Sequence, residues 1–450
     1  MNETGRIAYV FVRNRFAGTL QESDEGYRFK YDASYLDAVD PVSLTLPVRE
    51  APYDDRLMHP FFDGLIPEGW LLNIAVKNWK LDPNDRMGLL SSVCSDTIGY
   101  VSVLPTRDLQ LSSQSRLTLS GADETPTEPH PISSNRCLVC ARELNGSNRL
   151  YHDACSKRLF GSAHPPVVNL GANEISEMAK RSILNRITIP GVQKKLSVEV
   201  TRAGHGKEGT RITIVDAWGT HILKPPSDDF EEVPENEHLT LMLAEETGIQ
   251  TEAYGLVQLS SGERSFVAKR FDRDRQDKFA CEDFCQLLEH RSLEKYRGSV
   301  EQIAKAIARF SSVPGDDLFR FFELVVFCFL TGNADMHLKN FSLLTRPVAS
   351  KMNVRLSPAY DLLNTAIVIE TDEEESALTI DGRKKKIQRE NLLNSARTMG
   401  LADKVAERAL DQILKTVPRW EPIIERSFLS KDGKSRYSKI VSERAARLRG

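Results

Sequence analysis

The sequence has little net charge and lacks any long hydrophobic segment. Its 450 residues carry a formal net charge of −3 at pH 7, so no global attraction to nucleic acid or to a membrane surface is expected. The longest uninterrupted apolar run, residues 324–330, is far too short to cross a bilayer. The first residues do not show the charged and then apolar pattern of a secretory signal. These absences predict a cytoplasmic protein with no membrane partner.

Cysteine is also scarce, with seven residues in the whole chain. This odd number and the missing secretory pattern argue against a disulfide framework and favour a reducing compartment. Four of the cysteines lie in apolar surroundings and are expected to be buried in the core: Cys94, Cys281, Cys285 and Cys328.

The remaining three cysteines combine with a histidine in a C-x2-C and H-x2-C pattern formed by Cys137, Cys140, His152 and Cys155. Thiolates and an imidazole suit tetrahedral Zn²⁺, and four protein ligands would make such a site structural. The gap between the two pairs is short, and buried cysteine often serves simply as a small hydrophobic residue. Both interpretations, a zinc site and ordinary core cysteines, stay open from the sequence.

Composition divides the chain into five parts. Residues 1–105 indicate a small α/β domain, whose strands are expected at its beginning and end. Residues 106–135 are rich in Ser, Thr, Pro, Asp and Glu, as is typical of a flexible linker. The Cys/His segment occupies residues 136–165, strands and helices alternate over 166–275, and helical periodicity dominates 276–450.

Two acids of the first domain, Asp63 and Glu68, stand beside a predicted helix. Catalytic candidates do not cluster around them. We therefore expect these carboxylates to cap a helix and a turn rather than to take part in chemistry.

The stretch TGNADMHLKNFSLL carries the clearest chemical signal. Asp335 is followed five positions later by Asn340, the spacing of the catalytic loop of protein kinases. There the Asp accepts the proton of the attacking hydroxyl and the Asn holds a magnesium ion. A second acid, Asp361, follows a predicted pair of strands. Because of His337, the motif reads D-x-H-x-x-N, which differs from the common kinase motif.

A glycine turn and a strand lysine precede that loop. Gly191 follows Pro190 and is followed by Lys194 and Lys195, so backbone N–H groups and lysine charge could cradle phosphates, although an ordinary hairpin would look the same. Lys224 stands alone among apolar neighbours in THILKPP, where kinases hold the α- and β-phosphates. The alternative is a surface lysine at the end of a strand.

A helix is predicted to begin after Pro234 and to end at Gly248. Glu237 could pair with a strand lysine as in kinases, or could simply be an early acid favoured by the helix dipole. Strand, lysine strand, helix and strand, in this order, is the plan of a kinase N-terminal lobe. The predicted fold class is therefore α+β: a small N-terminal α/β subdomain joined to a two-lobed protein-kinase-like domain with an all-α C-terminal lobe.

With these pieces in order, the chain resembles the HipA family of bacterial serine/threonine kinases, the toxins of type II toxin–antitoxin modules. The resemblance covers nearly the whole length and is carried by FDGLIPEG, TIPGVQKKLS, HILKPP, PENEHLTLMLAEETGI, VAKRFDR, GNADMHLKNFSLL and LSPAYDLLN. The CLVC…YHDAC…LFG segment departs from the best-known HipA pattern. It resembles the beginning of the HipT kinases, in which the small N-terminal domain is a separate antitoxin protein, HipS. The chain resembles both parts fused.

The resemblance implies that Asp335 is the catalytic base and that Asn340 and Asp361 hold Mg²⁺. It also implies four groups of residues that contact ATP. The loop over the phosphates comprises Pro190, Gly191, Val192, Gln193, Lys194 and Lys195, and Lys224 contacts the phosphates. The hinge that reads adenine comprises Lys269, Arg270 and Phe271, and the residues along the nucleotide are His337, Leu338, Lys339, Asn340, Tyr360 and Asp361.

The resemblance also implies a regulatory site. Thr188 stands where the family has an autophosphorylated Ser, and Arg186 takes the place of the second hydroxyl residue of HipT kinases. A phosphate on Thr188 would add nearly two negative charges beside a loop that binds a negative nucleotide, which would switch the kinase off. The alternative is that Thr188 hydrogen-bonds the turn before Pro190.

Three classes of function fit the sequence. The first is an active Ser/Thr protein kinase toxin, whose substrate by analogy is an aminoacyl-tRNA synthetase. Since no helix-turn-helix is identifiable, it would reach DNA only through a HipB-type antitoxin. The second is a kinase-fold enzyme that phosphorylates a small molecule, with the same constellation of residues. The third is a non-catalytic partner or repressor module, which would be expected to have lost its catalytic Asp, whereas Asp335 is present.

Overall fold

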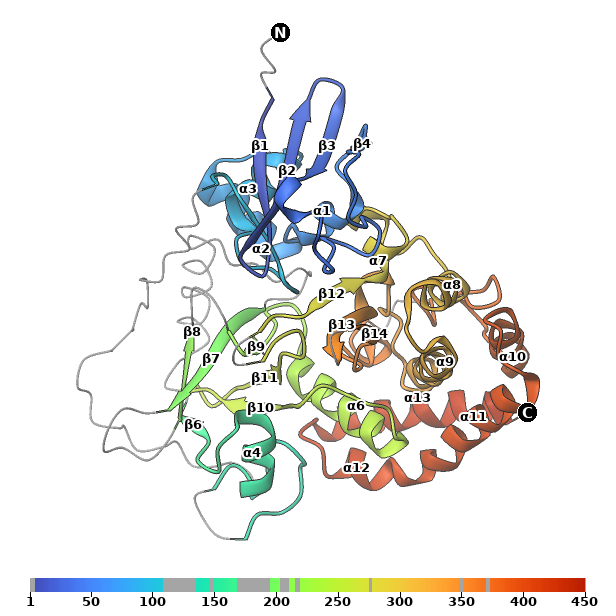
Figure 1. The fold of residues 1–450 in the computed structure, drawn as a ribbon. Coiled ribbons are helices and arrows are strands. Elements are labelled where there is room, and N and C mark those ends of the chain that lie inside the picture. Colours follow the sequence, from blue (N-terminus) through green and yellow to red (C-terminus); the bar gives the residue numbers. More distant parts are fainter. Residues whose placement is uncertain are drawn as a thin grey trace, which may run out of the picture.

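The structure is a computed structural model of the chain. It describes residues 5–107, 135–145, 149–167, 195–202, 210–214, 219–274, 277–348, 351–369 and 373–449 (Figure 1). The predicted linker lies almost wholly outside these residues, as do Thr188 and the glycine loop as far as Lys194.

The N-terminal domain is built on a five-stranded antiparallel sheet in the order β4-β3-β2-β1-β5. Its strands are β1 (Ile7–Val12), β2 (Arg15–Ser23), β3 (Gly26–Tyr31), β4 (Tyr53–Asp55) and β5 (Val101–Leu104). The predicted hairpin is confirmed by the pairing of β1 with β2, and the predicted closing strand is β5, which pairs with β1 and is buried along its whole length. Helices α1 (Pro60–Leu65), α2 (Gly69–Trp79) and α3 (Arg86–Val93) complete the domain, together with the 3-10 helix η1 (Ala33–Tyr35).

The second sheet forms the smaller lobe of the kinase-like part. It has six strands in the order β10-β11-β9-β7-β8-β6. They are β6 (Pro166–Val167), β7 (Leu196–Arg202), β8 (Thr210–Ile214), β9 (His221–Lys224), β10 (Tyr254–Gln258) and β11 (Arg264–Lys269). Helix α6 (Val233–Thr247) packs against β10 and β11, while helix α4 (Asp153–Phe160) lies beside β11, below the sheet in Figure 1.

The predicted end of α6 is confirmed, because Gly248 has φ +93° and caps the helix in the left-handed conformation, whereas the helix begins at Val233, slightly before the predicted start. An amphipathic helix is expected to bury one face only, but α6 is buried more completely than that. Residues 236–244 are buried all round, since sheet lies on one side and helices on the other.

The larger lobe is mainly helical (Figure 1). Its helices are α7 (Phe284–Leu287), α8 (Val300–Phe310), α9 (Pro314–Leu330), α10 (Arg389–Thr398), α11 (Asp403–Thr416), α12 (Glu421–Glu425) and α13 (Lys431–Arg449), with the 3-10 helices η2 (Ser292–Glu294), η3 (Leu338–Asn340), η4 (Thr365–Ile367) and η5 (Val417–Arg419). As expected from its apolar sequence, α9 is central and packs against α8, α11, α13 and β14.

The expectation of an all-α lobe needs one correction. A three-stranded antiparallel sheet, β12 (Ala280–Asp283), β13 (Ser342–Val348) and β14 (Lys351–Leu356), lies between the N-terminal domain and the helices (Figure 1). The pair β13–β14 was indicated by the sequence, but β12 is too short to give a periodicity of its own. This sheet matters for the site, because β13 directly follows the catalytic-loop motif.

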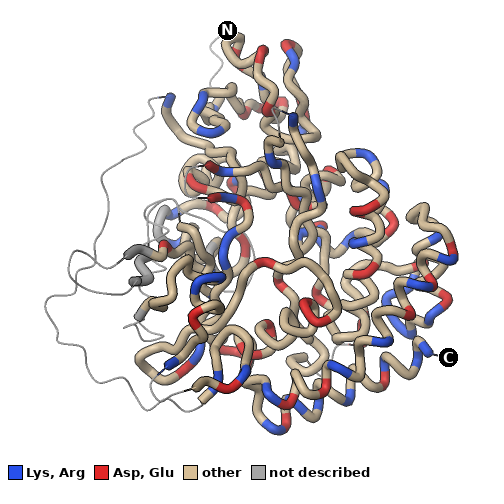
Figure 2. Tube along the Cα trace, turned by 60° about the horizontal axis from the view of Figure 1, so that its bottom comes forward, with Lys and Arg blue, Asp and Glu red and all other residues tan. Residues whose placement is uncertain are grey.

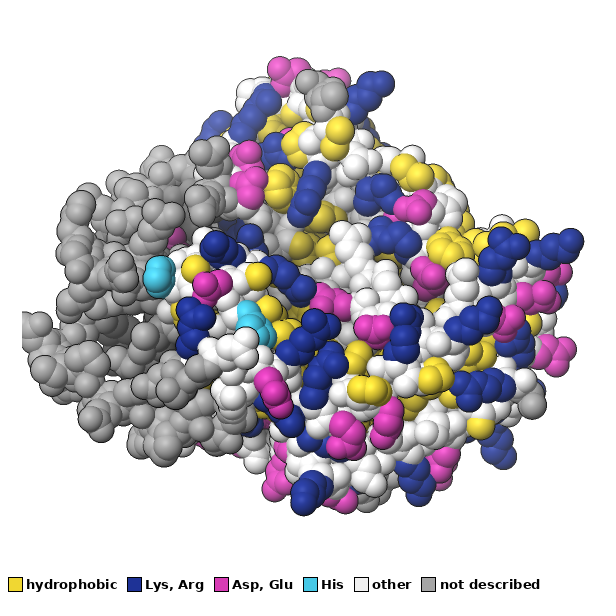
Figure 3. All heavy atoms as spheres, turned by 90° about the horizontal axis from the view of Figure 1, so that it is seen from below, with side chains coloured by type: hydrophobic (Ala, Val, Ile, Leu, Met, Phe, Trp, Pro, Cys, Tyr) yellow, Lys and Arg dark blue, Asp and Glu magenta, His cyan; other side chains and the backbone are white. Residues whose placement is uncertain are grey.

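Both lobes of the kinase-like part share one hydrophobic core, whereas the N-terminal domain has a separate core around its sheet. Acidic and basic residues are interspersed along the trace in Figure 2, and the face shown in Figure 3 carries both signs mixed with apolar patches. Among the described helices, none is long and apolar enough to cross a membrane.

Candidate active site

The catalytic-loop motif begins where α9 ends. Gly332 allows the chain to turn there, because it has φ +77° and a Cβ at this position would lie 2.6 Å from Asn364 Oδ1. Asn340 then donates from Nδ2 to the backbone carbonyl of Asp335 at 2.9 Å. This bond fixes the two ends of the motif relative to one another, and the amide oxygen of Asn340 is the atom of this side chain that could hold a metal ion.

The carboxylate of Asp335 opens onto a large cavity. Its Oδ1 accepts a hydrogen bond from the hydroxyl of Tyr296 at 2.8 Å. The surrounding protein raises the pKa of Asp335 by desolvation, while the Tyr296 hydrogen bond opposes that shift. Tyr296 also packs edge-on against the ring of His337, with centroids 5.0 Å apart. No sequence pattern singled out Tyr296, since it lies 39 residues before Asp335 in a different segment.

A chain of ion pairs joins the smaller lobe to the larger one across the cavity. Lys224, at the end of β9, contacts both Glu237 of α6 and Asp361. The prediction that Glu237 pairs with the strand lysine is therefore confirmed. Burial opposes the charge on Lys224, but Asp361 and Glu237 outweigh it and raise the pKa of the amine. The lysine is thus held as a cation in the cavity.

Asp361 is also bound by Lys195, whose Nζ lies 2.8 Å from Oδ2. Burial alone would raise the pKa of Asp361, but Lys195 and Lys224 hold it well below its usual range. Glu252, which the sequence did not indicate, lines the same cavity, and burial raises its pKa well above the ordinary value. The cavity therefore places two lysines among three acids, Glu237, Glu252 and Asp361.

The cavity has a volume of about 730 Å³, which is within the range of small-molecule sites. It brings together most of the described residues that the sequence predicted for it: Lys195, Lys224, Arg270, Phe271, Asp335, His337, Lys339, Asn340, Tyr360 and Asp361. Burial and the nearby Lys295 lower the pKa of His337 to about 3, so its ring is neutral at pH 7.

Two of the predicted residues lie elsewhere. Leu338 is fully buried in the hydrophobic core and anchors the loop there by apolar packing. Lys269 is exposed at the end of β11, and its N–H donates to Ala253 O at 2.7 Å. Neither is among the described residues that line the cavity.

The backbone of the predicted hinge is hydrogen-bonded to neighbouring segments at both Arg270 and Phe271. The N–H of Arg270 donates to Thr220 O at 2.9 Å, and the carbonyl of Phe271 accepts from Arg346 at 2.8 Å. Phe271 packs against the ring of Tyr360 with centroids 5.5 Å apart. The two aromatic rings provide an apolar wall of the kind on which a planar base would stack.

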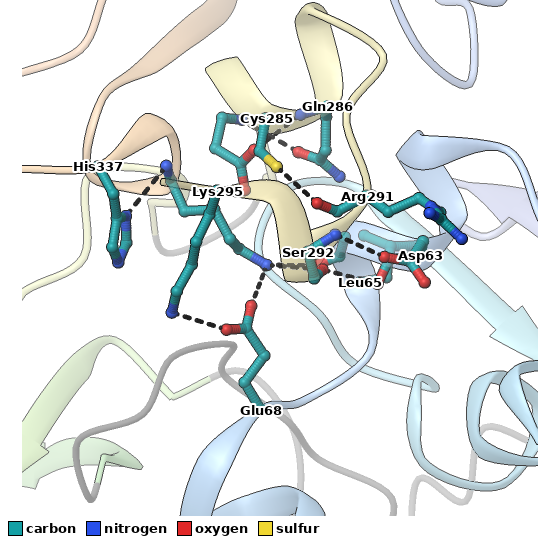
Figure 4. A network of polar contacts seen from close by, with 12 residues as sticks. Asp63, Leu65, Glu68, Cys285, Gln286, Arg291, Ser292, Lys295 and His337 are labelled. Carbon is teal, nitrogen blue, oxygen red and sulfur yellow. Dashed lines mark hydrogen bonds and ion pairs between the residues drawn. The ribbon is translucent and has the colours of Figure 1, made fainter. Parts of the chain in front are cut away.

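The N-terminal domain supplies part of the cavity wall, which the sequence did not predict. Gly64, Leu65, Glu68 and Ile98 all line it. Glu68 stands at the N-cap position of α2 but makes no capping hydrogen bond. Its carboxylate instead forms ion pairs with Lys295 at 2.9 Å and with Lys339 at 2.6 Å (Figure 4). The expectation that Glu68 caps a helix is therefore wrong.

Asp63 likewise reaches beyond its own domain. It pairs with Arg86 at 2.7 Å. It also accepts the backbone N–H of Ser292 at 2.8 Å (Figure 4). Ser292 begins η2, so Asp63 satisfies the first turn of a helix in another domain rather than its own turn. The corrections for Glu68 and Asp63 have the same physical cause. A carboxylate that is removed from water needs a cation or an N–H donor, and in the folded protein this partner can be distant in sequence.

The Cys/His cluster lies away from this cavity. The sulfurs of Cys137, Cys140 and Cys155 and a ring nitrogen of His152 lie within 4.8 Å of one another. The sequence had correctly grouped these four side chains. Cys94, Cys285 and Cys328 are buried in the core, as expected, whereas Cys281 is half-buried.

A sheet lobe with a buried Lys–Glu pair faces a helical lobe with the D-x-H-x-x-N loop across one cavity. This arrangement defines a two-lobed, protein-kinase-like fold. The HipA N-terminal domain model matches residues 8–104, and the HipA-like C-terminal domain model matches residues 187–420. The chain therefore belongs to the HipA family, with both domains in one polypeptide.

Individual relatives agree with this assignment. The Sinorhizobium fredii protein named "Putative kinase Y4dM" is 32% identical over 422 residues, which are 88% of this chain and 86% of the relative. "Putative kinase Y4mE" of the same species is 26% identical over 375 residues, covering 80% and 78%. HipA of Shewanella oneidensis, solved in complex with HipB and operator DNA, has a similar fold with a TM-score of 0.67 and 18% identity, over 98% of this chain and 97% of that one.

Proposed function

We propose that this protein is an ATP-dependent serine/threonine protein kinase. The observation that carries the proposal is the chain of contacts from Glu237 through Lys224 to Asp361, in the same cavity as Asp335. A cation fixed by two acids is what phosphate binding requires, because it supplies positive charge at a defined position. The names of two relatives, which describe them as candidate kinases, support the same activity.

Asp335 would act as the base. Its second carboxylate oxygen would accept the proton of an attacking hydroxyl while Tyr296 holds the first in place. The raised pKa of Asp335 makes the carboxylate a better proton acceptor than an exposed one. Lys224 would hold the phosphates, and Phe271 and Tyr360 would contact the base of the nucleotide.

The donor atoms fit Mg²⁺. Asn340 offers an amide oxygen, and Asp361 is kept ionised by its two lysines, so both present the hard oxygen ligands that this ion prefers. When bound, the ion would neutralise phosphate charge. Lys195 and Lys224 contact the two oxygens of Asp361 in this structure, so a bound ion would share this carboxylate with the two lysines.

Several narrower proposals follow from family membership. We propose a toxin role, a HipB-type DNA-binding antitoxin as partner and an aminoacyl-tRNA synthetase as substrate; the Shewanella oneidensis complex of HipA with HipB supports the second of these. Autophosphorylation of Thr188 would regulate the enzyme. A cytoplasmic location fits the free thiols of all seven cysteines.

The test compares wild type with Asp335→Asn, which keeps the shape and the Tyr296 contact but removes the base. Purified proteins receive labelled ATP with either lysate proteins or a metabolite extract of the host. We expect phosphoprotein in the wild-type reaction and a loss of roughly 10²–10⁴-fold in the variant. Label in metabolites alone would replace this proposal with a small-molecule kinase, and equal growth inhibition by both proteins would remove catalysis from the toxin role.

The substrate is identified by comparing phosphopeptides after induction of each protein. A synthetase peptide phosphorylated only with the wild type supports the proposed target. Phosphopeptides that depend on Asp335 but come from other proteins retain the kinase and replace the target.

A further inference from the structure

The segment that carries the Cys/His cluster belongs to neither matched domain. It lies between the HipA N-terminal match, which ends at residue 104, and the C-terminal match, which begins at residue 187. Its described regular structure consists of α4 and a short bridge between Arg136 and Glu143. Four potential metal ligands in so small a unit call for an explanation, and the activity proposed above does not use them.

The four donor atoms all lie within 4.8 Å of one another, close enough to surround one metal ion. His152 Nδ1 lies 3.4 Å from Cys140 Sγ and 3.9 Å from Cys155 Sγ. Ligands of one zinc ion lie roughly 3.5–3.8 Å apart, because Zn–S bonds are about 2.3 Å and Zn–N bonds about 2.0 Å long. A small movement of side chains would therefore complete the site.

The surroundings orient the histidine for a metal. Its Nε2 lies 2.9 Å from the carbonyl of Glu143 and must donate to it, so the lone pair is on Nδ1, which faces the sulfurs. The backbone N–H of His152 also donates to Cys137 Sγ at 3.4 Å. A ring nitrogen aimed at thiols, with the other one bound to a carbonyl, is the usual arrangement around protein zinc.

The turn between Cys137 and Cys140 is also hydrogen-bonded to the kinase-like part. The carbonyl of Leu138 accepts from Leu256 N–H in β10 at 2.8 Å, and the carbonyl of Val139 accepts from His238 Nε2 in α6 at 2.8 Å. Both carbonyls lie between the ligands Cys137 and Cys140. His238 is fully buried and is adjacent in the chain to Glu237, the partner of Lys224.

We propose that Cys137, Cys140, His152 and Cys155 bind one structural Zn²⁺, and that the zinc-bound turn holds α6 in position through Val139 and His238. Four protein ligands close the coordination sphere, so the ion is structural. Fixing Cys137 and Cys140 fixes the two carbonyls between them, and these hold β10 and α6. The effect on ATP rests on the function proposed above, whereas zinc binding and the position of α6 do not.

The first experiment measures metal content in the full-length protein purified without added metal. We expect about one zinc per chain in wild type and in Cys328→Ala, which removes a core thiol outside the cluster, and loss of zinc in Cys155→Ser. If Cys155→Ser does not fold, wild type is treated with chelator and titrated with Co²⁺, and thiolate-to-cobalt absorption should appear with one equivalent. Wild type without zinc and without a cobalt spectrum overturns the proposal, as does a disulfide among the three cysteines in freshly purified protein.

The second experiment follows amide hydrogen exchange of α6, which needs no nucleotide. Removal of zinc should increase exchange over residues 233–247 at least about tenfold, while α10, which packs against α8, α11 and α13, stays unchanged. Unchanged exchange in α6 after complete metal loss would refute the coupling. ATP affinity is then compared between zinc-loaded and zinc-free protein, and failure of even the loaded protein to bind ATP would count against the kinase proposal alone.

Discussion

The carboxylate of Glu68, in the N-terminal domain, lies 2.6 Å from the ammonium of Lys339, the residue before Asn340. A second lysine, Lys295, lies 2.9 Å from its other oxygen. The N-terminal domain therefore contributes directly to the charge balance of the loop that carries Asp335 and Asn340. Burial alone would raise the pKa of Glu68, but the two lysines lower it to about 2.

Replacing Glu68 by Gln should destabilise the protein by about 3 kcal/mol at pH 7, since it leaves two buried lysines without their carboxylate. The folded pKa of Glu68 lies below its ordinary value, so its stabilisation is complete above about pH 4.5 and is lost as the pH falls toward about 2. The difference between wild type and variant, measured by urea unfolding, should therefore shrink below pH 4.5.

The matched control is Glu407→Gln, an exposed position of α11, where a change within about 0.5 kcal/mol is expected. A Glu68→Gln protein as stable as this control at pH 7 would contradict the assigned role.

Replacing Tyr296 by Phe should move the acidic limb of the kinase pH profile upward. The hydroxyl donates to Asp335 and lowers its pKa, so its removal lets burial raise that pKa further. Because the base must be ionised to accept a proton, activity would then require a higher pH. Initial rates between pH 5 and 8 at saturating ATP give the limb, and a profile that moves downward or not at all opposes this assignment.

The ion-pair chain predicts non-additive effects. Lys224→Met should abolish ATP binding and lower stability, because it leaves Glu237 and Asp361 as buried acids without this cation. Adding Glu237→Gln should restore part of the stability but not ATP binding. The coupling energy from thermal or urea unfolding of the single and double variants is expected to be about 1–3 kcal/mol, and strict additivity would show that the pair does not form.

Gly255 of β10 tests the contact between the Cys/His segment and the sheet. A Cβ at this position would lie 2.8 Å from Leu159 and 2.9 Å from Val139, so Gly255→Ala should cost about 1–3 kcal/mol and increase amide exchange over residues 137–160. Gly315→Ala is the control, because no atom lies within 4 Å of its added Cβ and alanine favours the helix by about 0.5–1 kcal/mol. Equal stability of the two variants would argue against close packing.

Local sequence information was sufficient for the motifs that lie within one element. The Asp335 to Asn340 spacing, the strand lysine and the end of α6 follow from patterns within a few residues, and the order of elements made a pairing of Lys224 with Glu237 one of two interpretations. The ligands of the Cys/His cluster were grouped for the same reason, because 18 positions separate the first from the last.

Contacts between domains could not be predicted in this way. Glu68 and Lys295 are 227 residues apart, and neither has a neighbour that reveals the other. Glu252 looks like an ordinary acid at the start of a strand until the fold buries it beside Lys224. The same limit applies to β12, whose pairing with β13 depends on a segment about 60 residues away.

The N-terminal domain also contacts the residues that follow the predicted hinge. Asp96 pairs with Arg273 and Lys278, while Asp272 accepts the backbone N–H of Gly99 at 2.9 Å. One small domain is thus tied both to the connection between the lobes and, through Glu68, to the catalytic loop. Rotation of the lobes away from one another would have to break the contacts at one of these two points, so exchange of whatever occupies the cavity should be slowed.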